Sequence, residues 1–215
     1  MDYLYRTVAK KGFDEIIINK SRFIGYASPI VSEEEAIAFI KEIKEKHKDA
    51  THNVYGYVYG KGSNIQRFSD DGEPSGTAGI PVLEVIKKEE LRNVVVVVTR
   101  YFGGTKLGGG GLIRAYTKSA KLAIDSSIIV ENKLFNRILI KTSYSLYAKI
   151  ENYFIENTYK SESIDFLENV EINIFIEKSE TDRVISDLMN ITNGELFYEI
   201  RDEIYLPVKD GKRWV

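Results

Sequence analysis

The stretch that decides the fold is Asn93 to Lys121, NVVVVVTRYFGGTKLGGGGLIRAYTKSAK. It opens with five consecutive valines, a β-branched run that is typical of a strand buried on both faces. Two glycine clusters follow, and a helical pattern begins directly after them. The apolar and small residues of this helix recur at helical spacing on one face, at Leu112, Ala115, Tyr116, Ser119, Ala120 and Ala123. The stretch therefore predicts a buried strand, a glycine-rich loop and a helix that packs closely on its sheet.

The glycine-rich loop also predicts an anion site. Glycine loses more conformational entropy on folding than other residues do, so a cluster of glycines needs a reason. One such reason is a ligand that must approach the bare backbone. Free N–H groups at the start of a helix, with the helix dipole behind them, favour negative charge. Cationic side chains stand on both sides of the glycines, so the predicted anion or nucleic-acid site comprises Arg100, Gly103, Gly104, Lys106, Gly108, Gly109, Gly110, Gly111, Arg114 and Lys118. The alternative is that the glycines serve only tight turns and close strand–helix packing.

The composition is that of an ordinary globular protein. The chain has 215 residues, of which 43% are hydrophobic and 29% charged. No apolar run approaches the roughly 20 residues of a membrane span, so no membrane association is expected. The chain has no cysteine, which excludes disulfides and thiolate metal sites and favours a cytoplasmic protein.

The charge distribution bears on the choice of partner. The net charge of −2 gives no global reason to bind a polyanion. Residues 1–133 nevertheless carry a net charge of +3 and residues 134–215 one of −5. An RNA site is therefore expected to be local and to lie in the first half of the chain, and nothing predicts DNA specificity.

Hydrophobic patterning predicts an α+β protein with two domains and a tail, at residues 1–130, 134–206 and 207–215. In the first domain, strand signals on either side of residues 19–22 predict a hairpin or a bent strand, and Ser32 with Glu35 predicts a helix start. The helix that follows is expected to turn Ala36, Ile37, Ile40 and Ile43 inward.

The second domain reads as strand 135–142, helix 145–157, strand 160–166, strand 170–177, helix 180–190 and strand 195–206. This βαββαβ order predicts a ferredoxin-like fold. The polar tail is expected to be disordered, or to dock Trp214 on a partner.

Four residues are candidates for catalysis: His52, Asp70, Asp71 and Glu73. A histidine with carboxylates can bind a divalent metal or carry out acid–base chemistry. The spacing matches no H-E-x-x-H or EF-hand pattern, so no metal site is predicted. The alternative is that the aspartates cap a turn or the next helix, and that His52 bonds locally.

Five blocks, in order along the chain, closely resemble the signature of the YigZ/IMPACT family. They are Ser21–Ile24, Thr51–Asn53, Ser69–Pro74, Gly79–Glu84 and Thr99–Gly108. The resemblance implies an N-terminal domain like domain two of a small-subunit ribosomal protein, a fold shared with domain four of elongation factor G and with some small-molecule kinases. It also implies a C-terminal domain similar to domain five of that factor. Members of the family are regarded as candidate translation regulators with a candidate nucleic-acid-binding surface.

Three functions remain open at this point. The first is a non-enzymatic translation regulator that binds RNA or the ribosome through the glycine loop and needs no cofactor. The second is an enzyme acting on a phosphorylated or nucleotide-like small molecule, with Mg²⁺ held by the acidic candidates and His52 assisting. The third is a protein-interaction module, with the translation machinery as partner and the polar loop at residues 69–79 as the contact.

Overall fold

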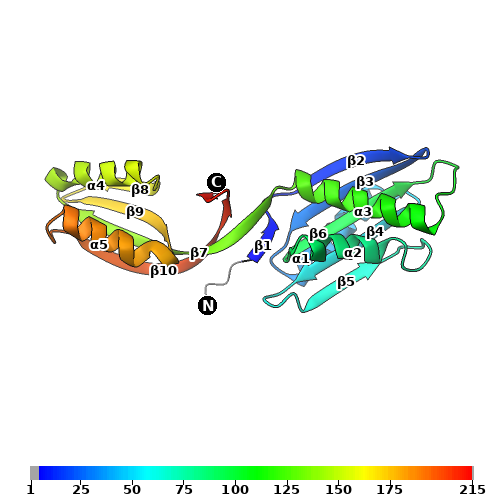
Figure 1. Ribbon diagram of the computed structural model, residues 1–215, viewed down its shortest axis with the longest axis horizontal. Coiled ribbons are helices and arrows are strands. Elements are labelled where there is room, and N and C mark those ends of the chain that lie inside the picture. Colours follow the sequence, from blue (N-terminus) through cyan, green and yellow to red (C-terminus); the bar gives the residue numbers. More distant parts are fainter. Residues whose placement is uncertain (1–4, 215) are drawn as a thin grey trace. The chain divides into compact units, whose positions relative to one another are not determined.

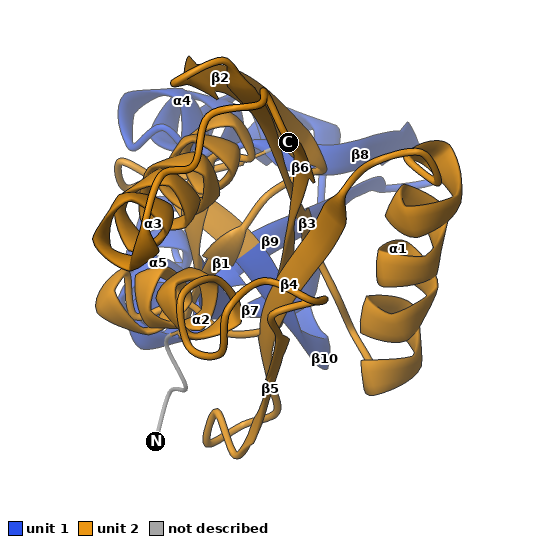
Figure 2. Cartoon of the chain, turned by 90° about the vertical axis from the view of Figure 1, so that its right-hand side faces the viewer, with its two compact units in different colours: residues 1–4, 132–206 blue, residues 5–131, 207–215 orange. Residues whose placement is uncertain are grey.

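The computed structural model describes residues 5–214, which form two compact units. Figure 1 shows the elements, and Figure 2 colours the units separately. The unit called N-terminal here contains residues 5–131 together with the chain from residue 207. The C-terminal unit contains residues 132–206. The protein is thus a mixed α+β protein with two domains.

The N-terminal unit is built on a five-stranded sheet in which every neighbouring pair of strands is antiparallel. In spatial order the strands are β2 (Gly12–Ile18), β3 (Ser21–Pro29), β6 (Val94–Tyr101), β4 (His52–Tyr59) and β5 (Ile65–Ser69). A short strand, β1 (Tyr5–Val8), lies off this sheet and pairs with β7 (Ile129–Thr142). The valine strand β6 is the middle strand of the sheet, so it has a partner on each side.

Helices cover both faces of this sheet (Figure 2). The helix α1 (Glu33–Lys46) covers one face, where Val95 and Val97 join its core. The helices α2 (Gly79–Lys88) and α3 (Gly109–Ser126) cover the other, where Val94, Val96 and Val98 pack. All five valines are fully buried, which confirms the prediction of a strand buried on both faces.

The residues at the hairpin turn and at the start of the first helix adopt the structures that their local sequence favours. Asn19 and Lys20 adopt φ of +46° and +68° in the two-residue turn between β2 and β3, as a tight hairpin requires. Ser32 caps α1 by accepting a hydrogen bond from the Glu35 N–H at 3.2 Å. The inward position of Ile37 was wrong, because its side chain is 57% exposed and Phe39 is buried in the core instead.

The C-terminal unit has the βαββαβ order, as predicted. After β7 come α4 (Tyr144–Glu156), β8 (Ser161–Phe166), β9 (Val170–Glu177), a 3₁₀ turn (Lys178–Glu180), α5 (Thr181–Ile191) and β10 (Phe197–Lys209). The spatial strand order is β10-β7-β9-β8, that of a ferredoxin-like sheet. Its core is made of alternate β7 and β9 side chains packed against the two helices, among them Ile138, Ile140, Ile150, Ile172, Ile174, Ile176 and Leu188.

The predicted disorder of the tail was wrong within the described residues. The chain turns at Asp210 and Gly211, both with positive φ, so that β11 (Lys212–Arg213) pairs with the end of β10. The Trp214 N–H donates to the Pro207 carbonyl at 2.8 Å, and Lys209 Nζ lies 5.6 Å from the centre of the Trp214 ring. Backbone pairing therefore orders this segment, although its sequence is polar.

Candidate functional site

Strand register gathers the candidate residues at one end of the N-terminal sheet. Arg100, near the end of β6, pairs with Phe23 on β3 and with His52 at the start of β4. The loop after β5, the loop after β6 and the first turn of α3 lie at this same end of the unit (Figure 1). Residues that are far apart in the sequence are thereby brought together.

Arg100 forms a buried salt bridge with Glu73. Its Nη1 lies 2.6 Å from Glu73 Oε1, and only 6% and 3% of the two side chains are exposed. Arg100 Nη2 donates to Ser21 Oγ at 3.3 Å, and the Tyr116 hydroxyl donates to the same Glu73 oxygen at 2.7 Å. Burial, together with this hydrogen bond to Glu73, raises the pKa of Tyr116 far above its usual range. Arg100 was predicted as part of an anion site, but its charge is compensated inside the protein, as a buried charge requires.

His52 and Asp71 are tied to their neighbours. His52 Nε2 lies 3.8 Å from Glu73 Oε2, and Nδ1 is 2.9 Å from the backbone carbonyl of Asp71. Because a carbonyl only accepts, Nδ1 carries the hydrogen of this bond. The Asp71 carboxylate receives Lys44 Nζ on one oxygen and the Asn53 N–H on the other, each at 2.6 Å. His52 therefore bonds locally, and the Asp71 carboxylate joins α1, β4 and the loop after β5.

Asp70 caps a helix from a distance. Its Oδ1 accepts from the N–H groups of Ala78 and Gly79, at 3.1 and 2.8 Å, and its Oδ2 accepts from Gly76 at 2.9 Å. The N-cap residue of α2 is Ala78, which has no side-chain oxygen to do this. The contacts of Asp70 thus agree with the alternative interpretation, in which it caps the next helix.

The glycines divide into two groups. A Cβ on Gly103 would lie 2.0 Å from the Lys20 carbonyl, and Gly104 and Gly108 have φ of +81° and +70°. Backbone geometry accounts for these three. On Gly109 and Gly110, by contrast, a Cβ would approach no atom closer than 3.8 and 3.7 Å respectively, and φ is not positive. Packing therefore does not explain Gly109 and Gly110, whereas a Cβ on Gly111 would lie 3.1 Å from Leu107 Cβ, a tight contact.

That first turn presents open amides next to unpaired cations. Within residues 5–214, the N–H groups of Gly109, Gly110 and Gly111 have no acceptor. Arg114 Nη1 lies 3.7 Å from where a Gly110 Cβ would be, so the guanidinium lies along this turn. We call this set the α3 cationic surface: Lys106, Gly109, Gly110, Gly111, Arg114 and Lys118.

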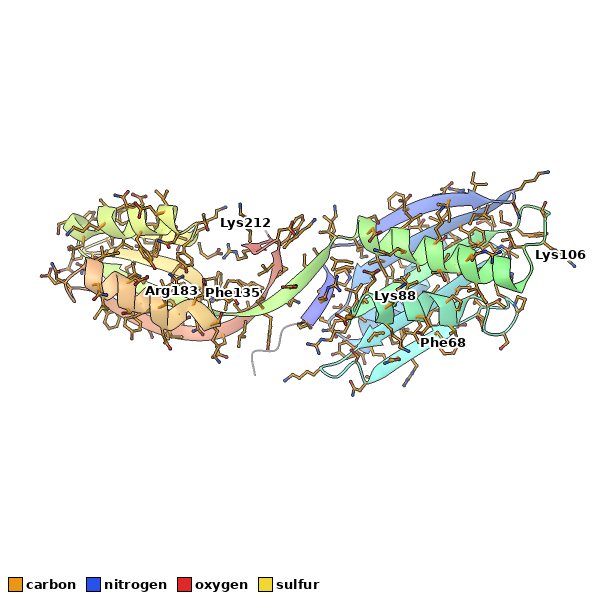
Figure 3. The ribbon with its side chains drawn as sticks, in the orientation of Figure 1. Phe68, Lys88, Lys106, Phe135, Arg183 and Lys212 are labelled. Carbon is orange, nitrogen blue, oxygen red and sulfur yellow. The ribbon has the colours of Figure 1, made fainter. Side chains whose placement is uncertain are left out.

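The three cations of this surface are exposed, and none forms a salt bridge with another described residue. Figure 3 labels Lys106, which lies in the loop before α3. One helical turn beyond Lys118, Lys121 is bridged to Glu89 and Asp125. Along α3, the cations without a salt bridge therefore lie in the half nearer its start, at Arg114 and Lys118.

A groove of about 320 Å³ lies between α2 and α3. It is lined mainly by apolar side chains, among them Ile80, Pro81, Val85 and Ile113, and by none of His52, Asp70, Asp71 or Glu73.

Across the described part of the chain, no three His, Asp or Glu side chains are grouped so as to hold a metal ion. No helix in residues 5–214 combines the length and hydrophobicity needed to cross a bilayer.

Three residues that contact the candidate residues Arg100, Glu73 and Asp71 were not identified from the sequence. Tyr116 was predicted only as part of the apolar face of α3, yet its hydroxyl bonds to Glu73. Lys44 carried no distinguishing signal, since it is an ordinary helix residue. Ser21 stood in the block Ser21–Ile24 that resembles the family signature, but no contact was predicted for it. A buried tyrosine does need a partner for its hydroxyl, and that was the one available hint.

Comparison with known proteins agrees with this architecture. The description "Impact N-terminal domain" matches residues 19–124, and "Domain of unknown function (DUF1949)" matches residues 140–195. The chain is 46% identical to IMPACT family member YvyE of Bacillus subtilis, over 91% of this chain and 90% of that protein. It is 43% identical to IMPACT family member YigZ of Escherichia coli, over 46% of this chain and 50% of that one.

Among solved structures, one described as the crystal structure of a hypothetical protein is similar, with a TM-score of 0.58 and 26% identity. The match covers 94% of this chain and 98% of that one, so both units are included. Extensive identity to YvyE along nearly the whole length, together with the two family descriptions, settles the relationship. The chain belongs to the IMPACT family.

Proposed function

We propose that this protein is a non-enzymatic regulator of translation that binds RNA or the ribosome, holding phosphates on the α3 cationic surface. The observation that carries the proposal is the juxtaposition there of open glycine amides with three unpaired cations. Amides at a helix start and nearby lysine or arginine side chains are the groups that proteins use to bind phosphate. Its place of action would be the cytoplasm, with proteins of the translation machinery as further partners.

Local charge compensation supports this choice of surface. The chain as a whole carries a net charge of −2, so an RNA molecule is not attracted by the protein in general. Asp70, Asp71 and Glu73 lie at the same end of the sheet, but each is engaged by cations or amides of the protein itself. Their negative charge is therefore offset locally, and the three exposed cations remain available to phosphates.

The same contacts count against the enzymatic alternative. A general base needs a free lone pair within reach of its substrate, and Mg²⁺ needs carboxylate oxygens that are free to coordinate it. Asp70 gives both oxygens to three backbone amides, and Asp71 gives both to Lys44 and Asn53. Glu73 is almost fully buried beside Arg100. Catalysis by these carboxylates would first require their hydrogen bonds and ion pairs within the protein to break.

Fluorescence anisotropy with a labelled single-stranded RNA tests the proposal, together with co-sedimentation with ribosomes, at roughly 50 and 200 mM salt. Binding is expected, and it should weaken steeply as salt is raised because bound phosphates release counterions. The triple variant Lys106→Ala, Arg114→Ala, Lys118→Ala should bind weakly and show a shallower salt dependence.

The matched control removes three exposed lysines elsewhere in the same unit, Lys10→Ala, Lys41→Ala and Lys48→Ala. Lys41 lies on α1, which covers the opposite face of the sheet from α3 (Figure 2). This variant has the same net charge as the first and should keep most of the affinity. If the wild-type protein binds neither RNA nor ribosomes at either salt concentration, the proposed function is wrong. Equal losses in the two triple variants would show that the attraction is not local.

A further inference from the structure

Phe102 is an aromatic side chain exposed at the end of the sheet where the α3 cationic surface lies. Its relative exposure is 47%, although it directly follows the buried strand β6. The Arg100 guanidinium lies over its ring, with Cζ 5.4 Å from the ring centre. Arg100 is itself held between Phe102 and Phe23, whose ring centre is also 5.4 Å away. The Phe102 ring is thus supported from within while much of its surface remains open.

The backbone beneath this ring is fixed on both sides. The Phe102 N–H donates to Thr51 Oγ1 at 3.0 Å, and the Gly103 N–H donates to Ser21 Oγ at 3.2 Å. Gly103 packs so closely on the Lys20 carbonyl that no side chain fits there. An exposed aromatic ring on a rigid backbone loses little conformational entropy when it binds a flat partner.

A short series of contacts connects the Phe102 ring to α3. Arg100, beneath the ring, bonds to Glu73 Oε1 at 2.6 Å, and Tyr116 of α3 bonds to the same oxygen at 2.7 Å. Lys106 of the α3 cationic surface is only four residues beyond Phe102, so their Cα atoms are at most about 14 Å apart. An RNA strand with a phosphate on Lys106 would therefore have Phe102 within reach of its bases.

We propose that Phe102 stacks on an unpaired base, so that the RNA bound by this unit is single-stranded. This inference rests on the proposed function and specifies its ligand. An aromatic ring can stack on the face of a base in a single strand, whereas a base inside a duplex has both faces covered by its neighbours. Stacking on Phe102 also tolerates any base, since every base has a π face.

Three ligands of equal length separate the contribution of base stacking from that of the phosphates. They are a single-stranded RNA, the same backbone without bases, and the matching duplex. Phe102→Ala should weaken binding of the single strand by at least about fivefold, the low end of the effect of removing one stacking aromatic. Binding of the base-free backbone should not change, and the salt dependence should keep its slope because no phosphate contact is lost. Phe13→Ala, which removes a phenylalanine that is 66% exposed on β2, should leave all three affinities unchanged.

Two further variants test whether a loss of RNA binding in Phe102→Ala comes only from a loss of folded structure. Phe102→Leu keeps apolar bulk over Arg100 but has no ring, so it should bind like Phe102→Ala and melt like the wild type. Phe102→Trp should retain binding. In a Trp214→Phe background it is the single tryptophan of the chain, and stacking on the RNA should quench its fluorescence.

If single-stranded RNA binds Phe102→Ala and Phe102→Leu as tightly as the wild type, the inference is overturned while the proposed function survives. Equal losses for the single strand and for the base-free backbone would also overturn it. If the wild type binds no RNA, the proposed function fails and this inference fails with it.

Discussion

Arg100 and Glu73 form a salt bridge of 2.6 Å in which the side chains are only 6% and 3% exposed. Removing two charges from water is expensive, and their attraction offsets the cost only when further hydrogen bonds complete the geometry. Ser21 and Tyr116 supply two such bonds, while Arg100 Nε is buried with no hydrogen-bond partner within residues 5–214. The pair therefore fastens the loop after β5 to the middle strand and to α3, which positions the α3 cationic surface.

Breaking this pair on one side should be strongly destabilising. Glu73→Gln leaves the Arg100 charge buried without a counter-charge, and the free energy of unfolding should fall by about 3–5 kcal/mol. The double variant Glu73→Gln, Arg100→Met should lose less than the sum of the single variants, because neither charge is then left alone. Urea denaturation measures both. The exposed pair Lys11–Glu42 is the control, and Lys11→Ala should cost no more than about 1 kcal/mol. Additive losses at Glu73 and Arg100 would contradict the coupling.

Asp70 should matter for stability rather than for chemistry. Asp70→Ala removes the acceptor of three backbone amides and leaves the start of α2 uncapped. The expected loss is about 2 kcal/mol, the upper end for a helix cap. Amide hydrogen exchange should accelerate at Gly76, Ala78 and Gly79. Asp70→Asn, which keeps one oxygen, should lose roughly half as much stability. Unchanged exchange at these three amides would refute the capping role.

The sequence was informative wherever one segment determines its own structure. Val94 to Val98 predicted a doubly covered strand, and alternation in Val170 to Ile176 placed the fourth element of the βαββαβ unit. The polar tail was misread from its composition, although a local signal was present. Asp210-Gly211 is a hairpin-turn dipeptide, and it joins β11 to the end of β10.

The candidate site depends on both local and distant residues. The cluster of glycines and cations was visible in the sequence, because a helix start lies within one short segment. The neutralisation of Arg100 was not visible, because Glu73 is 27 residues away and reaches it only through the fold of the loop after β5. Charged residues in a sequence show which ion pairs are available, and only the strand register shows which of them form.

His47 should make stability depend on pH. Its ring nitrogens contact the hydroxyls of Tyr26 and Tyr101 at 2.7 and 2.9 Å. Burial, with a smaller contribution from the charges of Lys46 and Arg22, lowers its pKa below the ordinary value of 6.5. The unfolded chain then binds a proton at a higher pH than the folded one does. The contribution of His47 is full above the ordinary pKa, and it is lost as the pH falls from there through the folded pKa.

Comparison with His47→Gln isolates this effect from the carboxylates that titrate in the same range. The free energy of unfolding of the wild type should fall more between pH 7.5 and pH 5 than that of the variant, by an amount set by the pKa difference. The chain has two histidines, so an NMR titration can follow His47 directly. Parallel stability curves for the two proteins would rule out the effect.

Gly110→Ala distinguishes the two roles of the glycines. A Cβ there would meet nothing closer than Arg114 Nη1 at 3.7 Å, an ordinary contact, and the residue is helical. Alanine should therefore stabilise the protein, by up to about 1 kcal/mol, because it loses less backbone entropy on folding. If the amides of this turn bind phosphate, the added methyl group keeps the ligand away and RNA affinity falls although stability rises. Gly62→Ala, at a position with no atom within 4 Å, is the control and should leave binding unchanged. Higher stability with unaltered RNA affinity in Gly110→Ala would assign this glycine to backbone geometry and remove its amide from the RNA site.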